Sequence, residues 1–578
     1  MTTCIHGVDI DQQAVEVTVM SLYLKMLEGK LPANWQRDWL ENQLLPTLDN
    51  NVLCGNSLID SADFDRWVID THGGLFPPDD DIRFRMNRFD WASRTRGFGW
   101  ALDSEAEQET GRRGFDCIIG NPPYIRVQEL NKWAPDECAF YKWRYKSAAK
   151  GNYDIYVVFV QRCLELLAPD GLLGYIMPHK FWQAKYGEGL RKIIADGKHL
   201  RSMVDFGDQQ VFQGATTYTA VHLLCASPTD TPIRYAKVLD LSDGEAQCRS
   251  IDAGKTAAGT MAFRAAREMP SAGWAFVDAS QSEFLNCLIA QGPTLGDYAA
   301  KVFVGLQTSA DKVFILERRG SRFFSDDLQT EVDIEPTFLH PLLKGSVHMK
   351  RWVPRASEQV VLFPYARNDA AFRLVAEKKM RKDGPKTWTY LERCRPSLGK
   401  RERGTYEGSE WYGYVYPKNL SSMSLPKILT PSLAQRGEYS FDGTGNLFFV
   451  GSGGGGGGGY GILLHQPEMY EYVLGLLNSA LLNWFVQKIT TPFHSGWFAY
   501  NKQFIEQIPI KIPATAGEKK LGDRIADSVR AIIDAKSQLR DGKLSDRERV
   551  SLECDVESLE RRIDELVFRL YGVDGVPE

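Results

Sequence analysis

Residues 1–225 alternate between short apolar runs and longer segments whose apolar residues recur three and four positions apart. The short runs predict buried strands, and the longer segments predict amphipathic helices. Strands are predicted at "IHGVDID", "NNVLCGNSL", "FDCIIG", "LLGYIMP", "MVDFGDQQVF" and "TAVHLLCAS", and helices at "QQAVEVTVMSLYLKML" and "YDIYVVFVQRCLELLAPDG". This alternation indicates an α/β domain with a mainly parallel, doubly wound sheet. A polar stretch at 60–113, rich in Asp, Arg and Gly, is predicted to be a surface insertion.

The pattern changes after residue 225. Between 226 and 510, short strands such as "KVFVGLQTSADKVFIL" and "EYSFDGTGNLFFV" alternate with loops and short helices, which predicts an α+β domain. Leu, Ile and Val then recur at helical spacing in "LGDRIADSVRAIIDA" and "LECDVESLERRIDELVFRLYG", so 511–578 is predicted to form a helical hairpin. We therefore expect three domains, at 1–225, 226–510 and 511–578.

Composition restricts the class of protein. The chain has 578 residues, of which 43% are hydrophobic and 25% are charged, and this balance is typical of a globular protein with more than one core. No apolar run is long enough to span a membrane, and the N-terminus lacks the pattern of a signal peptide. The ten cysteines form no CxxC pair. We therefore expect a cytoplasmic protein with reduced thiols, no metal site and no membrane partner.

Charge is distributed unevenly. The net charge is −5, which argues mildly against nucleic-acid binding over the whole surface. However, residues 373–403 contain eleven Lys or Arg and four Asp or Glu, interleaved with Trp388 and Tyr390. Taken alone, such a run favours a solvated helix face. If another feature points to DNA, the same run gains weight as a set of phosphate contacts.

The stretch "FDCIIGNPPYI", residues 115–125, ends an apolar strand in Asn-Pro-Pro-Tyr. Pro122 and Pro123 remove two backbone donors, so the segment can neither continue a sheet nor open an ordinary helix. Ligands of open α/β sheets bind beyond the carboxyl ends of the strands. There, the Asn121 amide oxygen and the Pro122 carbonyl can hold both hydrogens of an exocyclic amino group. Tyr124 offers a ring on which a flipped-out base can stack. The alternative is a plain turn between a strand and a helix.

An ordered series of segments resembles the DNA amino-methyltransferases, namely "GVDID", "LCGNSL", "FDCIIGNPPYIR", "YDIYVVFVQRCLELLAPDGLLGYIMPHKFW" and "VDFGDQQVFQGATTYTAV". They are similar to the adenine-N6 class of TaqI-like and Eco57I-like restriction–modification proteins and their phage-defence relatives. The segments "GLQTSADKVFIL", "LLKGSVHMKRW", "YLERCRPSLGKRERG" and "YNKQFIEQIPI" resemble the target-recognition domain of that group. The resemblance implies a Rossmann-like methyltransferase domain that uses S-adenosyl-L-methionine, a TaqI-like α+β recognition domain, and double-stranded DNA as substrate.

The resemblance assigns the catalytic roles as follows. Asn121 and Pro122 would hold the target amino group, with Pro123 fixing the motif and Tyr124 stacking on the base. Phe212, in "VFQGAT", matches the second aromatic residue that closes the pocket of the flipped base. A core position is the alternative for Phe212.

The resemblance also implies a cofactor site. Asp9, at the end of its strand, would bind the ribose hydroxyls of S-adenosylmethionine, and Ile10 would pack on the cofactor's adenine. Asn56 occupies the position at which the family has Asp or Asn against the adenine edge, and Asn121 would border the cofactor as well. Each residue has a simpler alternative, because Asp9 can cap the following helix and Asn56 can serve a turn.

One element of the family pattern is expected to be absent. The family's first strand and its glycine-rich turn, of the form Asp-Pro-(Ala/Pro)-Cys-Gly-Ser-Gly, stand immediately before the segment that "GVDID" matches, where this sequence has "MTTCIH". The glycine run at 451–461 leads into "ILL" rather than a helix, which disfavours it as a replacement. We therefore expect either a split enzyme, with a partner chain that supplies this element, or a truncated methyltransferase.

Three functions remain open from the sequence. The first is a DNA adenine-N6 methyltransferase subunit or fragment of a restriction–modification or phage-defence system. The second is a non-catalytic, sequence-reading DNA-binding subunit of such a system. The third is an RNA or protein methyltransferase, since the Asn-Pro-Pro-Tyr motif also occurs there. The catalytic hypothesis requires Asn121 and Tyr124 for DNA modification, whereas the non-catalytic hypothesis does not.

Overall fold

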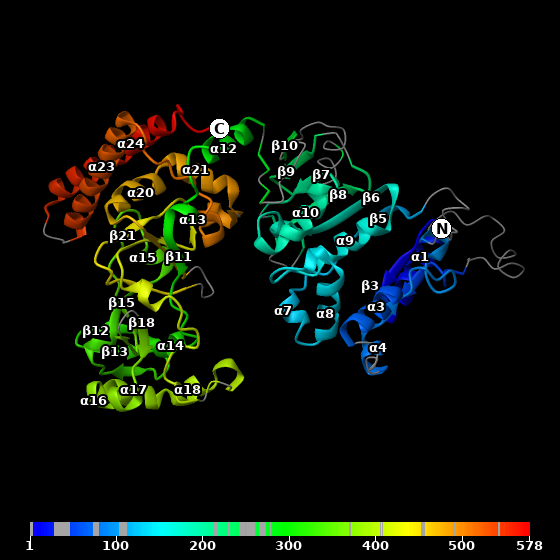
Figure 1. Cartoon of the computed structure of the whole chain (residues 1–578), viewed down its shortest axis with the longest axis horizontal. Coiled ribbons are helices and arrows are strands. Elements are labelled where there is room, and N and C mark those ends of the chain that lie inside the picture. The colour runs from blue at the N-terminus through cyan, green and yellow to red at the C-terminus, as the bar shows by residue number, and fades with distance from the viewer. Residues whose placement is uncertain are drawn as a thin grey trace, which may run out of the picture. The chain divides into compact units, whose positions relative to one another are not determined.

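The structure is a computed structural model of the whole chain. The structure describes all residues except 1–3, 28–46, 73–79, 103–112, 208, 213–216, 229–231, 242–248, 250–259, 265–272, 275, 278, 369–370, 405, 407, 452–456, 491, 541–543 and 578. Two compact units make up the chain, unit 1 at Met1–Ala279 and unit 2 at Ser280–Glu578 (Figure 1). The division lies beyond the expected boundary at residue 225, because two further strands, Arg234–Val238 and Thr260–Arg264, continue the sheet of unit 1. The helical hairpin that the sequence predicts at 511–578 belongs to unit 2.

Unit 1 is an α/β unit, as the alternating pattern predicts. Its strands are β1 Gly7–Asp9, β2 Val52–Cys54, β3 Asn56–Asp60, β4 Arg88–Phe89, β5 Phe115–Gly120, β6 Leu167–Pro178, β7 Leu200–Asp205, β8 Thr219–Cys225, β9 Arg234–Val238 and β10 Thr260–Arg264. Its α-helices include α1 Gln12–Leu27, α3 Ser61–His72, α4 Asp80–Met86, α5 Gly99–Leu102, α7 Val127–Leu130, α8 Pro135–Arg144, α9 Tyr156–Leu166 and α10 Glu188–Asp196.

The main sheet of unit 1 has six strands in the order β10-β9-β7-β8-β6-β5. The expectation of a mainly parallel sheet is wrong, because β8 runs antiparallel to both β6 and β7. The helix α10 joins β6 to β7, but the described residues between β7 and β8 form no helix, so the chain reverses there. β5 pairs parallel with β6, and β6 and β7 both pair antiparallel with β8. The carboxyl ends of β5, β6 and β7 therefore lie at the same end of the sheet.

The stretch 60–113 is not a surface insertion. Phe64 and Trp67 of α3 are buried in the main core of unit 1, together with α8, α9 and the central strands. A second cluster, hereafter the aromatic cluster, contains Phe89, Trp91, Phe98 and Leu166. Large aromatic side chains bury so much surface that a few of them anchor a stretch that is polar on average.

Unit 2 contains two larger sheets and several smaller ones. One has the order β14-β13-β12-β16-β15-β22 and the other the order β11-β23-β19-β21. Their strands are β11 Ala299–Val304, β12 Ile315–Arg319, β13 Arg322–Ser325, β14 Thr330–Val332, β15 Leu339–Leu343, β16 Gln359–Leu362, β19 Lys427–Pro431, β21 Ser440–Asp442, β22 Phe448–Phe449 and β23 Gly459–Leu464. The helices of unit 2 include α16 Glu377–Asp383, α17 Pro385–Arg393, α18 Arg395–Gly399, α20 Tyr470–Leu477 and α21 Ala480–Ile489.

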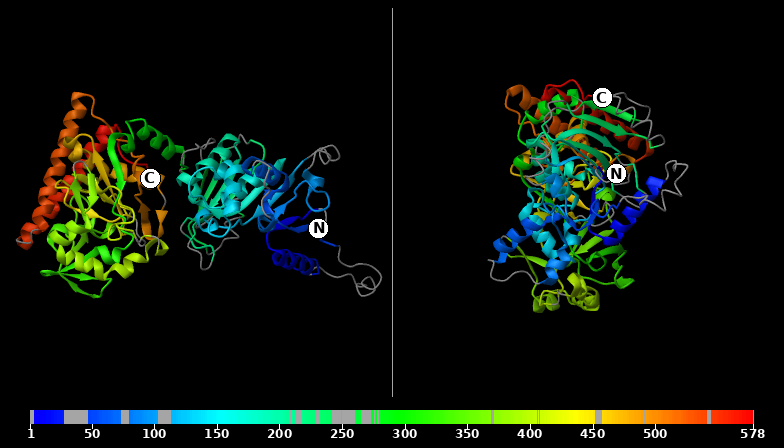
Figure 2. Two further views of the ribbon diagram at one scale, coloured as in Figure 1. Left: turned by 60° about the horizontal axis from the view of Figure 1, so that its bottom comes forward. Right: turned by 90° about the vertical axis from the view of Figure 1, so that its right-hand side faces the viewer.

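Two long helices close the chain, α23 at Ala516–Arg540 and α24 at Asp546–Tyr571, and they pack on each other as a hairpin (Figure 2). Helix α23 lies against α20, where a side chain at Gly475 would meet the Ile525 Cγ2 atom at 2.5 Å. Ser545 and Glu548 form a capping box at the start of α24. Among the residues that the structure describes, every helix is too short or too polar to cross a lipid bilayer.

Candidate active site

The Asn-Pro-Pro-Tyr motif directly follows β5, at the end of the sheet where β6 and β7 also terminate. The strand ends at Gly120, which faces Tyr175 on β6. A Cβ atom at Gly120 would lie 2.9 Å from the Tyr175 ring, so only glycine fits here without displacing that ring. Asn121 is exposed, Pro122 is buried and Pro123 is exposed. The motif therefore presents the Asn121 side chain to solvent from a backbone that the prolines hold stiff.

Tyr124 holds the Asn121 side chain. Its hydroxyl lies 2.6 Å from the Asn121 Oδ1 atom and 3.1 Å from the carbonyl oxygen of Ile176, so its single hydrogen is shared between the two acceptors. Burial raises the pKa of Tyr124 to about 12, so the hydroxyl stays a donor at neutral pH. The ring is half-buried and meets the ring of Tyr156 in a T-shaped contact at 6.4 Å. An amide oxygen accepts two hydrogen bonds, so Asn121 keeps one acceptor position for a ligand.

The chain beyond the motif is tied to the start of α9. The Val127 amide donates to the Tyr153 carbonyl at 2.8 Å, and the Ile155 amide donates to the Ile125 carbonyl at 2.9 Å. The Asp154 carboxylate lies between these contacts and accepts from the Tyr186 hydroxyl at 3.3 Å. Burial raises the pKa of Asp154. Asp154 lies two residues before α9, and the sequence motifs do not single it out.

Two of the four residues expected at the cofactor site, Asp9 and Ile10, lie at the end of β1. Asp9 is exposed, and its Oδ1 atom accepts from the Asp11 amide at 2.9 Å. Asp11 in turn accepts from the Gln13 amide at 2.9 Å at the start of α1, so Asp11 is the residue that caps the helix. Ile10 is 54% exposed. An exposed carboxylate beside an exposed apolar side chain suits a ligand that has both a diol and an apolar ring.

Asn56 is not placed for a ligand. It is 5% exposed, and its Nδ2 atom donates to the Tyr141 hydroxyl at 3.1 Å and to the Glu137 carboxylate at 3.3 Å. Its Oδ1 atom accepts from the Leu58 amide at 3.1 Å, which is the turn role that the sequence left as the alternative. Contact with a cofactor would require breaking these bonds, so the geometry disfavours the expected cofactor role.

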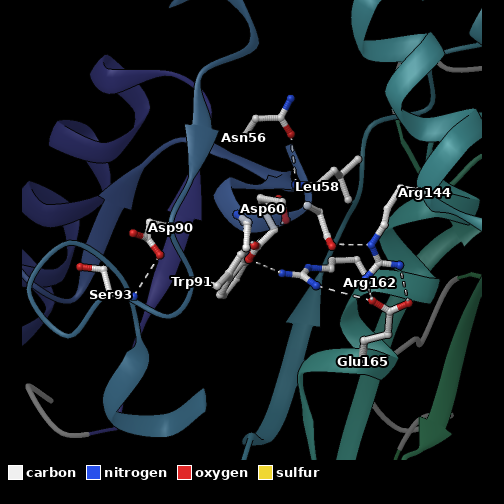
Figure 3. A network of polar contacts seen from close by, with 12 residues as sticks. Asn56, Leu58, Asp60, Asp90, Trp91, Ser93, Arg144, Arg162 and Glu165 are labelled. Carbon is white, nitrogen blue, oxygen red and sulfur yellow. Dashed lines mark hydrogen bonds and ion pairs between the residues drawn. The ribbon is translucent and has the colours of Figure 1, made fainter. Parts of the chain in front are cut away.

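Ion pairs hold β3, the strand that begins at Asn56 (Figure 3). Arg162 of α9 lies between Asp60, at 3.2 Å, and Glu165, at 3.5 Å, and its guanidinium stands over the Trp91 ring. Arg144 of α8 also binds Glu165, at 2.8 Å. These contacts hold β3 against α8 and α9, and they make the surroundings of Asn56 a rigid part of the core.

Phe212 lies seven residues beyond the end of β7 and is half-buried. Since β7 ends at the same edge as β5, the chain leaves the sheet there on the side that carries Asn121. Residues 213–216, which complete the "VFQGAT" segment, lie outside the described residues. The structure thus brings Asn121 and Tyr124 into contact and leaves the pairing of Phe212 with them as a prediction.

A buried polar cluster at the ends of β6 and β7 escaped the sequence interpretation. The Asp205 carboxylate lies 2.9 Å from His179 Nδ1 and accepts from the Tyr235 hydroxyl at 2.6 Å and from the Gly207 amide at 2.8 Å. Burial opposes the negative charge of Asp205, but these hydrogen bonds outweigh burial and lower its pKa. The cluster fixes this edge of the sheet, because every oxygen of the carboxylate has a partner.

The strand β5 has one paired edge and one open edge. In the part of the chain that the structure describes, β5 pairs with β6 alone, while β1 pairs with β2 in a separate two-stranded sheet. Cys117 of β5 is exposed, and Ile119 is 80% exposed. Both Val8 of β1 and Ile118 of β5 pack against the aromatic cluster. Among the described residues, β1 and β5 therefore pack on the same aromatic cluster but are not paired by hydrogen bonds.

Comparison with known proteins places this arrangement in context. Residues 3–212 match the Eco57I restriction-modification methylase family. The chain is 26% identical to the type II restriction enzyme and methyltransferase RM.Eco57I of Escherichia coli, over 99% of this chain and 54% of that protein. It is 25% identical to the type II methyltransferase M.BstVI of Geobacillus stearothermophilus, over 73% of this chain and 72% of that protein. It thus spans about half the length of RM.Eco57I.

The fold has a counterpart among solved structures. The structure of the type IIL restriction-modification enzyme MmeI in complex with DNA is similar, with a TM-score of 0.52 and 13% sequence identity, over 80% of this chain and 55% of that one. The matched segment 3–212 includes β1, the Asn-Pro-Pro-Tyr motif and β7. Over this segment, the chain is similar to the Eco57I restriction-modification methylase family.

Proposed function

We propose that this protein methylates adenine N6 in double-stranded DNA with S-adenosyl-L-methionine, as part of a restriction–modification or phage-defence system. The observation that carries the proposal is the exposed Asn121 amide oxygen at the carboxyl end of β5, held by the Tyr124 hydroxyl at 2.6 Å. Two similar proteins support it: RM.Eco57I is named as a restriction enzyme and methyltransferase, and M.BstVI is named as a methyltransferase.

The chemistry follows from the two acceptors. Adenine N6 is unreachable inside a duplex, so the target base would be flipped out and stacked on the Tyr124 ring, with Phe212 closing the other side. The Asn121 oxygen and the Pro122 carbonyl would each accept one hydrogen of the amino group. This arrangement favours a pyramidal nitrogen, whose lone pair is freed from the ring. The proton that the amino group loses would pass to water, because neither acceptor is basic.

The residues at the end of β1 fit the cofactor in part. Asp9 would bind the ribose hydroxyls through its exposed carboxylate, and Ile10 would cover the adenine ring. S-adenosylmethionine would supply an electrophilic methyl group, whose bond to sulfur breaks as the amino nitrogen forms its new bond to carbon. We leave Asn56 out of the proposed site, because its side chain is buried and both its nitrogen and its oxygen are hydrogen-bonded within the protein.

We also propose that a further segment, from a partner chain or from a longer form of this chain, adds a strand and a glycine-rich turn beside β5. The support is the open edge of β5 together with the exposure of Cys117 and Ile119, since an apolar strand with an unpaired edge is a template for pairing. Ile119→Lys should weaken cofactor binding by the assembled complex. Val550→Lys is the matched control, because Val550 is an exposed apolar residue of unit 2. Equal binding by both variants would contradict the added strand.

The first experiment is a calorimetric titration of S-adenosylmethionine into the chain alone and into the chain expressed with the products of its neighbouring genes. We expect binding to the complex and none to the chain alone. The same complex should form N6-methyladenine in duplex DNA, detected by mass spectrometry. Duplex binding without methylation would favour the non-catalytic DNA-binding subunit. Methylation of RNA or protein in place of DNA would overturn the proposed substrate.

A further inference from the structure

A pocket of about 790 Å³ opens in unit 2 beside α18 and the loop that leads to Trp411. Its lining includes Arg395, Lys400, Tyr406 and Trp411, together with the acidic Glu392. The helices α16, α17 and α18 follow one another in this part of unit 2 (Figure 1). The pocket therefore lies in the basic stretch 373–403, where a solvated helix face and a phosphate-binding surface are the two alternatives.

The basic residues of this stretch fall into two groups. The first group is paired with carboxylates: Lys379 with Asp383 at 2.5 Å, Arg381 with Glu377 at 2.9 Å and Glu392 at 3.0 Å, and Lys386 with Asp333 at 2.5 Å. These residues behave as a solvated helix face. The second group is exposed and has no carboxylate partner among the described residues: Arg373, Lys378, Lys382, Arg393, Arg395 and Lys400. Of these, Arg395 and Lys400 line the pocket.

A buried positive charge lies behind the pocket wall. Arg401 is 6% exposed, and its guanidinium donates to the carbonyl oxygens of Leu398 at 2.9 Å, Gly413 at 2.7 Å and Trp411. It also stands over the Tyr406 ring at 4.8 Å. Burial lowers the pKa of Arg401, yet a guanidinium stays charged in proteins. Since its hydrogen-bond acceptors are neutral carbonyls, its charge adds to the positive potential of the pocket.

Arg395 is pre-oriented by an aromatic ring. Its guanidinium lies 4.9 Å from the centre of the Trp411 ring, and Trp411 packs edge-to-face on Trp388 at 5.6 Å. A guanidinium stacked on a ring keeps its N–H groups in one plane and free for a bidentate contact with an oxyanion. Glu392 reduces this field without reversing it, because Arg381 binds its carboxylate and three positive charges, Arg395, Lys400 and Arg401, lie in or behind the pocket wall.

We propose that this pocket binds a backbone phosphate of the DNA duplex, with Arg395 and Lys400 as the contacting residues. The inference rests on the proposed function, because it takes DNA as the substrate. The ligand is the phosphodiester itself, so the contact positions the duplex and reads no base. The ring of Tyr406 borders the same pocket and can accept the adjoining sugar.

The test is fluorescence anisotropy of the full-length protein with labelled duplexes of two unrelated sequences, over a series of salt concentrations. Arg395→Ala with Lys400→Ala should weaken binding by about tenfold, to the same degree on both sequences. The slope of log affinity against log salt concentration should become shallower by about 0.9 for each phosphate that the variant no longer neutralises. Lys379→Ala is the matched control, since Lys379 is paired in the same stretch, and it should change binding little.

Each outcome separates the two proposals. Binding by the double variant that equals binding by the wild type would overturn the pocket and leave the proposed function intact. A decrease confined to one of the two sequences would also overturn it, because that result indicates base readout. If the wild-type protein binds neither duplex at any salt concentration, the proposed function fails together with the pocket. Lys400→Glu, at an exposed position, repeats the test without touching the ring of Trp411.

Discussion

Asn121 and Asn56 each follow a short apolar strand of unit 1, and the family resemblance gives both a role with ligands, but their surroundings differ. Asn121 is exposed, and the Tyr124 hydroxyl is the partner that the structure gives its side chain. Asn56 is buried, and every polar atom of its side chain has a partner within the protein. An exposed amide can reach a substrate, whereas a buried amide whose nitrogen and oxygen both bond within the protein is part of the core. The contrast predicts opposite effects of substitution at the two sites.

The largest effect is expected at Asn121. Asn121→Ala should lower methyl transfer to duplex DNA by about 10²–10³-fold, by analogy with the loss of one pre-oriented group that stabilises a transition state. Its free energy of unfolding should stay within about 0.5 kcal/mol of the wild type, because the side chain is exposed. The rate is measured as N6-methyladenine formed by the assembled complex, and stability by urea unfolding. Unchanged methylation would contradict the catalytic role.

Asn56→Ala should show the reverse. The variant leaves the Leu58 amide without its acceptor and removes one donor each from Glu137 and Tyr141, which should lower the free energy of unfolding by about 1–3 kcal/mol. Cofactor affinity, measured by calorimetry at a temperature where the variant is folded, should match the wild type. A selective loss of cofactor affinity at full stability would restore the cofactor role that the sequence suggested.

The contrast between the two asparagines also shows what sequence can predict. The strand and motif at 115–124 follow from local pattern alone, since the apolar run and the two prolines act within ten residues. The partners of Asn56 lie 81 and 85 residues away, so no local pattern shows that its side chain is used within the core. The buried Phe64 and Trp67 were hidden in the same way by the polar residues around them. The antiparallel β8 had a visible signal, because the segment before it carries no helical pattern.

The pH dependence of stability sharpens the comparison, because the neighbours of Asn56 titrate. Burial raises the pKa of Glu137 above its ordinary value, although the hydrogen bonds from Tyr141 and Asn56 oppose the rise. The folded state therefore holds this proton more tightly than the unfolded state does. The stability from this site is full below the ordinary glutamate pKa and is lost as pH rises through the raised value.

Glu137→Gln removes that dependence while its amide oxygen still accepts from Tyr141. The variant should gain stability relative to the wild type as pH increases from acid to neutral, because only the wild type loses the bound proton. Urea unfolding at a series of pH values measures the difference between the two proteins. Asn121→Ala serves as the matched control and should leave the wild-type dependence on pH unchanged. Parallel curves for wild type and Glu137→Gln would show that this carboxyl group is not responsible.

The smallest effect is expected at the hydroxyl of Tyr124, which distinguishes positioning of Asn121 from stacking of the base. Tyr124→Phe keeps the ring and removes the hydrogen bond to the Asn121 Oδ1 atom, so kcat should fall about fivefold with little change in KM. Tyr124→Ala removes the ring as well and should weaken binding of the flipped base by a further ~1–3 kcal/mol. Fluorescence of 2-aminopurine at the target position reports flipping in each variant. Because the pKa of Tyr124 is about 12, the difference between Tyr124→Phe and the wild type should be constant at every pH below the ordinary tyrosine value of 10. If Tyr124→Phe matches the wild type in kcat, Asn121 holds its orientation without this hydroxyl, and the ring alone accounts for the tyrosine.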